Sequence, residues 1–157
     1  MRILQILALG LLVCATVQAR EEPEVMSRHQ AGLYGEQLLS IGASKLAQAY
    51  LEAAVYGDNA VDAIPSLKLS DPRDPPSDRE HFAQSLAELY WDNGKVGRAV
   101  DVATHLLRKP EMTLWRCRAA ESKAYYAFAR QCYESLDDYD RAERVIREQA
   151  LSSSARS

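Results

Sequence analysis

Apolar residues recur at intervals of three and four along most of this chain, and short turn signals interrupt the pattern again and again. That spacing places apolar side chains on one face of an α-helix. No segment alternates β-branched and polar residues in the way a half-buried strand does. The sequence therefore predicts an all-α fold of short helices joined by tight turns.

The helices are expected in three antiparallel pairs. Glycines such as Gly42 and Gly94 are typical of the turn that ends one helix and begins the next. The run from Asp71 to Pro76 contains three prolines and cannot be helical. The predicted pairs are 28–61, 80–113 and 122–156, with a Pro-rich loop at 62–78.

Each predicted pair carries one small residue on each helix. Small residues at matched positions let two antiparallel helices approach closely, while larger apolar residues around them interdigitate. The separation is twelve residues from Gly35 to Ala47 and from Ala87 to Ala99, and thirteen from Ala129 to Ala142.

The second pair carries the fullest form of the pattern. Its residues are Ala83-x2-Leu86-Ala87-x2-Tyr90 on the first helix, followed by Gly94, Ala99, Ala103 and Pro110. This order resembles the tetratricopeptide repeat, a unit of about 34 residues with the pattern W-x2-L-G-x2-Y…A-x3-F…P. The resemblance covers most of 28–156. It implies a short α-α superhelix of about three antiparallel helix pairs.

The spacing between pairs departs from that unit. Ala47 and Ala99 are 52 residues apart, and Ala99 and Ala142 are 43 apart. Insertions are therefore expected in the Pro-rich loop and in 114–122. Two alternatives remain open: a Sel1-like helix repeat, which the stretch 45–57 favours, and an unrelated helical bundle.

Residues 1–19 resemble an export signal. A positive start is followed by an apolar run and then by Val17-Gln18-Ala19, the small-x-small pattern that a signal peptidase cuts. We expect cleavage after Ala19, a periplasmic or secreted location, and no membrane span in the mature chain. An uncleaved anchor is one alternative. An outer-membrane lipoprotein is another, because Cys14 ends a lipobox-like run.

The remaining chain divides into three parts. We expect an N-terminal lead at 20–27 that is frayed over 20–24, the helical repeat domain at 28–151 and a disordered polar tail at 152–157.

Composition and motifs argue against several classes of function. Lys and Arg number 19 against 22 Asp and Glu, which gives a net charge of −3. Nucleic acid is therefore not an expected partner, because phosphate binding needs clustered positive charge. The histidines are isolated, and the chain has neither a phosphate-binding loop nor a nucleophile elbow. The sequence predicts no enzyme, no metal and no cofactor.

Two cysteines, Cys117 and Cys132, lie in the predicted mature chain. Residues 112–135 contain neither Gly nor Pro, which favours one long helix. In one helix the two cysteines would lie about 22 Å apart at about 1.5 Å per residue, whereas a disulfide needs Cα atoms within about 7 Å. Buried free thiols are therefore expected. A disulfide would require a break in the helix near Glu121-Ser122.

The resemblance also implies a binding surface, because the first helix of each repeat lines a groove in the tetratricopeptide family. Large amphipathic residues and arginine on such a surface commonly anchor interfaces. The alternative is that Trp91 and Tyr133 are covered by loop 62–78 or by the helix at 112–135. The candidate residues are His81, Gln84, Glu88 and Trp91 in the second pair, and Lys123, Tyr126, Arg130 and Tyr133 in the third.

The leading functional hypothesis is an exported, non-catalytic protein that binds another protein or peptide as a scaffold or assembly factor of the cell envelope. The alternative is a periplasmic immunity or inhibitor protein that blocks the cleft of a toxic enzyme with loop 62–78.

Overall fold

The computed structural model describes residues 24–57, 64 and 66–155. The predicted signal peptide at 1–19, with Cys14, lies outside the described residues. Seven helices and two short strands make up the described part. The helices are α1 (Arg28–Ser40), α2 (Ser44–Tyr56), α3 (Arg79–Asp92), α4 (Val96–Leu106), α5 (Lys109–Ser122), α6 (Tyr126–Glu134) and α7 (Tyr139–Ser154), and the strands are β1 (Glu24–Met26) and β2 (Leu67–Leu69).

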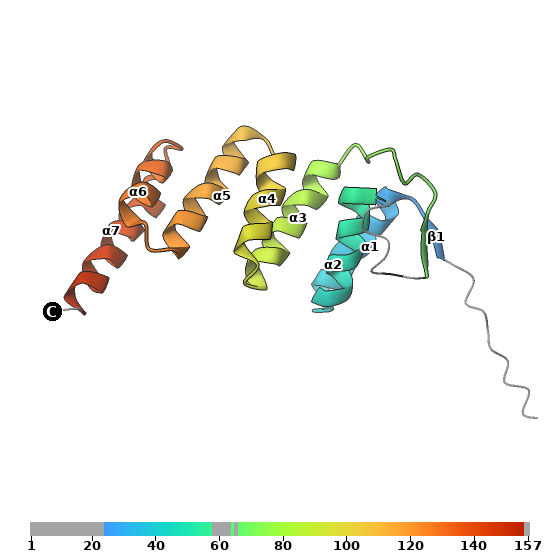
Figure 1. Cartoon of the computed structure of the whole chain (residues 1–157), viewed down its shortest axis with the longest axis horizontal. Helices are drawn as coiled ribbons and strands as arrows, with labels where there is room; N and C mark the ends of the chain where they lie inside the picture. The colour runs from blue at the N-terminus through green and yellow to red at the C-terminus, as the bar shows by residue number, and fades with distance from the viewer. Residues whose placement is uncertain (1–23, 58–63, 65, 156–157) are drawn as a thin grey trace, which may run out of the picture.

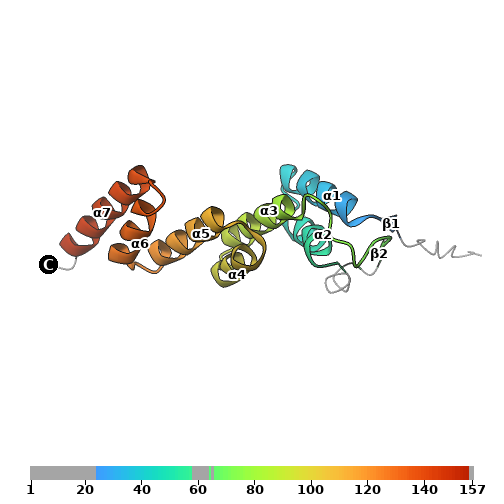
Figure 2. The same cartoon turned by 90° about the horizontal axis from the view of Figure 1, so that it is seen from above.

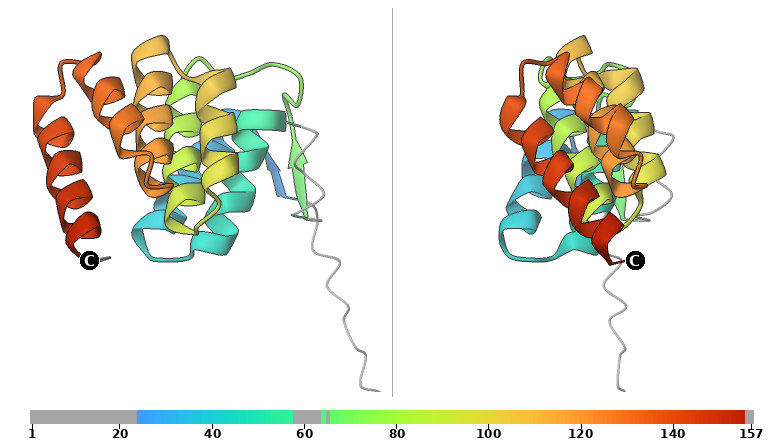
Figure 3. Two further views of the ribbon diagram at one scale, coloured as in Figure 1. Left: turned by 60° about the vertical axis from the view of Figure 1, so that its left-hand side comes forward. Right: turned by 90° about the vertical axis from the view of Figure 1, so that its left-hand side faces the viewer.

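The helices form a row of packed antiparallel pairs, which confirms the predicted all-α fold. α1 packs on α2, α3 on α4 and α5 on α6, and α7 closes the row against α6 (Figure 1). The strands lie at the α1–α2 end of the row and α7 at the other (Figure 2). Viewed along the row, the successive pairs stack behind one another (Figure 3).

One kind of turn joins the helices of all three pairs. Its middle residue has a left-handed backbone, with φ of 79° at Gly42, 72° at Gly94 and 59° at Ala124. The next amide closes the turn by donating to a carbonyl in the preceding helix, from Ala43 to Leu38, from Lys95 to Tyr90 and from Tyr125 to Ala120. The same turn also joins α6 to α7, with φ of 58° at Asp137 and a hydrogen bond from the Asp138 amide to the Tyr133 carbonyl.

The predicted helix at 112–135 is wrong, because α5 ends at Ser122 and α6 begins at Tyr126. The break is at Ala124, whose positive φ is unfavourable for a residue with a Cβ. Neither Gly nor Pro marks this turn, so it carries no conventional turn signal. The predicted pair 122–156 corresponds to α6 and α7, which do pack together, while α5 supplies an additional helix.

With α5 and α6 as a pair, the spacing becomes regular. α3, α5 and α7 begin at Arg79, Lys109 and Tyr139, which are 30 residues apart. α4 and α6 begin at Val96 and Tyr126, again 30 apart. The insertion expected at 114–122 is therefore absent, and this segment is the body of α5.

A disulfide between Cys117 and Cys132 joins α5 to α6. The two Cα atoms are 5.4 Å apart, because the turn after Ser122 brings α6 back along α5. The expectation of free thiols is therefore wrong. That expectation was derived from a single helix over 112–135, and the structure has two helices there.

The described residues just before α1 and those of β2 and the start of the Pro-rich run are held by hydrogen bonds and burial. β1 and β2 pair in parallel, with Val25 opposite Lys68, and Glu24, the one described residue of the segment expected to be frayed, is paired with Leu67. Leu67 and Leu69 are buried, and Asp71 accepts a hydrogen bond of 2.7 Å from the Arg28 amide. The Pro-rich loop is thus attached to the first helix pair.

The C-terminal tail is also more ordered than predicted. Ser152 to Ser154 belong to the last turn of α7, so a disordered tail beginning at residue 152 is wrong.

The interior is divided into two clusters of buried residues. The larger cluster is formed by α1 to α4, the two strands and Trp115 of α5. The smaller one joins α5, α6 and α7. It consists of Cys117, Ala120, Ala129, Tyr133, Ala142 and Val145. Three of those six are alanines, so the C-terminal part of the row has little apolar surface to bury.

Candidate functional site

Contacts between an acidic and a basic side chain join the first helices of successive pairs and α7 along one side of the row. Each pair places a carboxylate of one helix against a base of the next, and we call the surface that they mark the ladder face. The pairs are Glu36–His81 between α1 and α3 (2.8 Å), Glu88–Arg118 between α3 and α5 (3.0 Å), and Glu121–Arg144 between α5 and α7 (2.7 Å).

Two tryptophans hold Arg118 in the middle of the ladder face. The Trp91 and Trp115 rings meet edge to face with centroids 5.5 Å apart. The Arg118 guanidinium carbon lies 4.4 Å from the Trp91 centroid and 4.1 Å from the Trp115 centroid. Glu88 accepts hydrogen bonds from the same guanidinium with both carboxylate oxygens. This packing fixes Arg118 before any ligand arrives, which lowers the entropic cost of binding.

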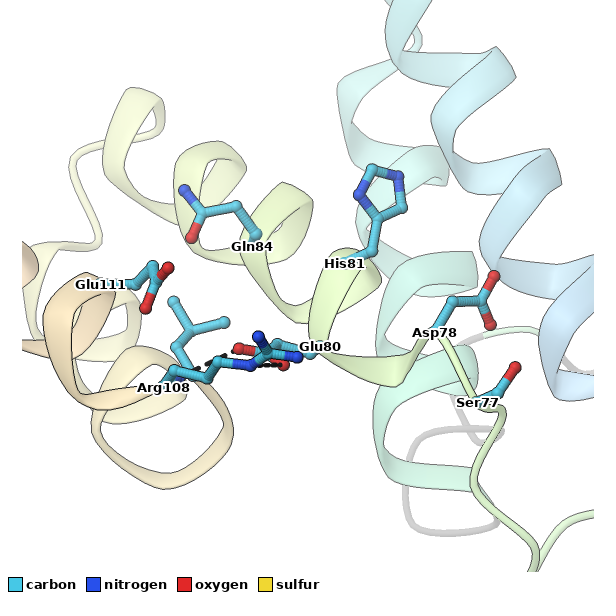
Figure 4. Close-up of a pocket in the computed structure, with 8 residues that line it drawn as sticks. Ser77, Asp78, Glu80, His81, Gln84, Arg108 and Glu111 are labelled. Atoms are coloured by element: carbon cyan, nitrogen blue, oxygen red, sulfur yellow. Dashed lines mark hydrogen bonds and ion pairs between the residues drawn. The ribbon is translucent and has the colours of Figure 1, made fainter.

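A first cavity of about 410 Å³ lies between the start of α3 and the start of α5 (Figure 4). Glu80 accepts a hydrogen bond of 3.0 Å from Arg108 Nε on one wall, and Glu111 projects from α5 on another. The cavity is lined by Ser77, Asp78, Glu80, His81, Gln84, Leu107, Arg108 and Glu111. We call it the acidic cavity, because it has three carboxylates against one arginine.

A second cavity of about 450 Å³ lies between α3, α5 and α7. Its lining residues are Glu88, Trp91, Arg118, Glu121, Ser122, Tyr133, Arg141 and Arg144. We call it the basic cavity, because three arginines face two glutamates.

Tyr133 reaches the basic cavity from α6 and is otherwise buried. Its hydroxyl donates a hydrogen bond of 2.6 Å to Glu121. The Glu121 carboxylate also accepts hydrogen bonds from Nε and Nη2 of Arg144. Burial, followed by the hydrogen bond to Glu121, raises the pKa of Tyr133 well above its usual range. The hydroxyl therefore stays protonated and acts as a fixed donor at neutral pH.

The structure brings together five of the eight predicted binding residues. His81, Gln84, Glu88 and Trp91 form one stripe of α3 on the ladder face, and Tyr133 joins the last two in the basic cavity. Lys123 is an exposed residue of the α5–α6 turn, and Tyr126 packs against the smaller core. Arg130 is paired with Glu134 on its own helix. These three residues line neither cavity.

Several residues of the site were not among the predicted ones. These residues come from α5 and α7. The sequence predicted one long helix at 112–135, so α5 was not recognised as the first helix of the third pair. A usable signal was present: Cys117 precedes Ala129 by the same twelve residues that separate Ala87 from Ala99. The additional residues are Trp115, Arg118, Glu121, Arg141 and Arg144.

Among the described residues, no group of three or more side chains is arranged to hold a metal ion. In the same part of the chain, no helix has the length and apolar character required to cross a membrane.

The chain was compared with protein-family models, with curated proteins and with solved structures, and none of the three comparisons finds a match. The ladder face and its two cavities are therefore the features that bear on function.

Proposed function

We propose that this protein is an exported, non-catalytic helical repeat protein of the tetratricopeptide kind that binds another protein or a peptide along the ladder face. It would serve as a scaffold or assembly factor in the cell envelope. One observation carries the proposal: α3 presents a continuous stripe of polar and aromatic side chains between two open cavities. The stripe is held rigid by contacts with α1 and α5.

The chemistry of this face suits recognition of a polypeptide. Tryptophan and arginine are common anchors of interfaces, and here Trp91 and Arg118 are packed against each other before binding. Gln84, half-buried in the wall of the acidic cavity, donates to Glu88 and accepts from the Trp115 indole, and its amide retains a second N–H and a second lone pair for a peptide backbone. The arrangement therefore provides both apolar and polar contacts for a polypeptide.

Two observations support export. Residues 1–19 have the pattern of a signal peptide. Cys117 and Cys132 form a disulfide, and disulfides persist mainly in oxidising compartments outside the cytosol.

Affinity capture with a matched control tests the proposal. The immobilised oxidised protein is compared with a Glu88→Lys variant and with a Glu143→Lys control. Glu143 also forms an ion pair, with Arg147 on the same helix α7, but Glu143 lines neither cavity. We expect one partner to be retained by the wild type and the control and lost by Glu88→Lys. Equal retention by all three proteins would refute binding along the ladder face.

The alternative of an immunity or inhibitor protein assigns the contact to loop 62–78. In this loop Leu67 and Leu69 are buried and Asp71 holds the Arg28 amide, so these residues serve the fold. The same capture experiment tests this alternative when an Arg73→Glu variant is immobilised as well, since Arg73 is an exposed residue of this loop. Loss of the partner from Arg73→Glu alone would favour the inhibitor.

A further inference from the structure

The outer face of α1, the first helix of the row, carries no acidic side chain, lysine or arginine. α1 lies at the edge of the row, where α2 and α3 are the helices that pack closely on it (Figure 2). Each of the other six described helices exposes at least one Asp, Glu, Lys or Arg. The exposed residues of α1 are His29, Gln30, Leu33, Tyr34, Gln37 and Ser40.

Large apolar side chains are exposed on the same side of α1. Leu33 is 44% exposed and Tyr34 is 39% exposed, and Ile41, which caps the end of the helix, is 76% exposed. The Tyr34 ring meets the ring of Tyr50 edge to face, and Leu46 lies one helical turn before Tyr50 on α2 with 45% of its surface exposed. We call the surface formed by Leu33, Tyr34, Gln37, Ile41 and Leu46 the α1 face.

The two ends of the row differ in the polarity of their outer helices. A terminal repeat needs a polar outer face to remain soluble. α7 meets this requirement, because Glu143 and Arg147 are exposed beside Ile146. The α1 face does not meet it. Few charges combined with exposed aliphatic and aromatic side chains is the composition of the core of an interface.

The order of residues on the α1 face suits contact with a second copy of the same face. Leu33 lies four residues before Gln37, and Ile41 lies four residues after it, so the three share one side of the helix. Two α1 helices laid antiparallel about a two-fold axis at Gln37 would place Leu33 of each copy against Ile41 of the other. The Gln37 amide can both donate to and accept from its own symmetry mate.

The absence of charge also favours a second copy over an unrelated protein. A two-fold contact brings the same patch of both subunits together, so a patch with a net charge would repel itself. The α1 face has no such charge to oppose the contact.

We propose that the protein forms a symmetric homodimer through the α1 face, with the two α1 helices antiparallel and Leu33 of one copy packed against Ile41 of the other. No residue of the α1 face lines the acidic cavity or the basic cavity, so the dimer contact uses neither of them. The inference goes beyond the proposed function and does not depend on it.

Sedimentation velocity over a dilution series of the oxidised protein measures the dimer directly. The wild type is compared with Leu33→Lys, with Ile41→Glu and with the control Leu151→Lys, which changes an exposed leucine of α7 at the other end of the row. Circular dichroism checks that all four proteins have the same helix content.

We expect the wild type and the control to dimerise with the same dissociation constant. Each α1 variant should raise that constant at least about tenfold, which corresponds to about 1.4 kcal/mol, because every substitution occurs twice in the dimer and places a charge against an apolar side chain. A wild type that sediments as a monomer at every concentration would overturn the proposal and leave the α1 face to a different protein. An equal loss of dimer in Leu151→Lys would overturn it too.

Mixing the two α1 variants tests the antiparallel contact itself. In a mixed dimer the introduced lysine of one copy faces the introduced glutamate of the other, and the second Leu33–Ile41 contact is intact. An equimolar mixture should therefore recover dimers at a concentration where each variant alone is monomeric. A mixture that stays monomeric there would overturn the proposed pairing of Leu33 with Ile41.

Discussion

Reduction of the Cys117–Cys132 disulfide should destabilise the C-terminal helices by about 3 kcal/mol. The bond links α5 to α6 with a sequence separation of 15 residues. Closing a loop of that size in the unfolded chain corresponds to about 3 kcal/mol of stability. Apolar burial in the smaller core compensates little for the loss of the disulfide, because three of the six buried residues of this core are alanines.

That magnitude is large for this part of the molecule. Full burial of one valine such as Val145 contributes about 1.5–3 kcal/mol, so the disulfide matches the contribution of one or two such side chains. A loss of about 3 kcal/mol changes a folding equilibrium by about two orders of magnitude. We therefore expect α5 to α7 to unfold before α1 to α4 once the bond is broken.

Urea titration followed by far-ultraviolet circular dichroism measures the effect. The protein is compared with and without reductant, and a Cys117→Ala/Cys132→Ala variant controls for the reductant itself. We expect the reduced protein and the double variant to lose the same free energy of unfolding, with α5 to α7 melting in a separate earlier transition. Coincident titrations of oxidised and reduced protein would refute the reasoning, as would an equal effect of reductant on the double variant.

Three further predictions follow from the packing. Ala87→Leu and Ala99→Leu should each lower the free energy of unfolding by about 1–3 kcal/mol in urea titration, because both alanines are fully buried in the α3–α4 pair and extra methylenes overpack it. Gly32→Ala should lower the melting temperature in calorimetry, because a Cβ at this position would overlap the Phe82 ring; an unchanged melting temperature would show that the ring moves aside. The folded state raises the pKa of Tyr133 and so keeps it protonated, whereas the unfolded tyrosine ionises near pH 10. Stability should therefore be fully present below about pH 10 and fall as the pH rises above it, and a Tyr133→Phe variant should show a weaker alkaline loss in pH-dependent thermal unfolding.

The helical character and the pairing of α1 to α4 were predictable from the sequence. Apolar spacing of three and four marked the helices, and glycines with positive φ marked the turns at Gly42 and Gly94. At Ala124 the same turn is formed by a residue that does not favour it, so local propensity pointed to a continuous helix. Tertiary packing, with the Cys117–Cys132 bond, outweighs that local preference.

The candidate site was predictable only in part for the same reason. The α3 stripe was identified from its spacing, because both ends of α3 were correctly placed. Trp115 and Arg118, which contact this stripe, could be assigned to the site only if α5 was recognised as the first helix of a pair. That assignment requires the turn at Ala124, which the sequence does not mark. β1 and β2 were missed for a different reason: strands of three residues are too short to show alternation, and they form only by pairing across 40 intervening residues.

The most direct test of the central claim is site-specific photo-crosslinking to the partner in intact cells. A photoreactive residue is placed at Gln84 on the ladder face, at Glu143 outside the two cavities, or at Arg73 in the Pro-rich loop. Binding along the ladder face predicts a single crosslinked partner from position 84, and none from positions 143 and 73. A partner crosslinked from position 73 or 143 and not from position 84 would contradict it.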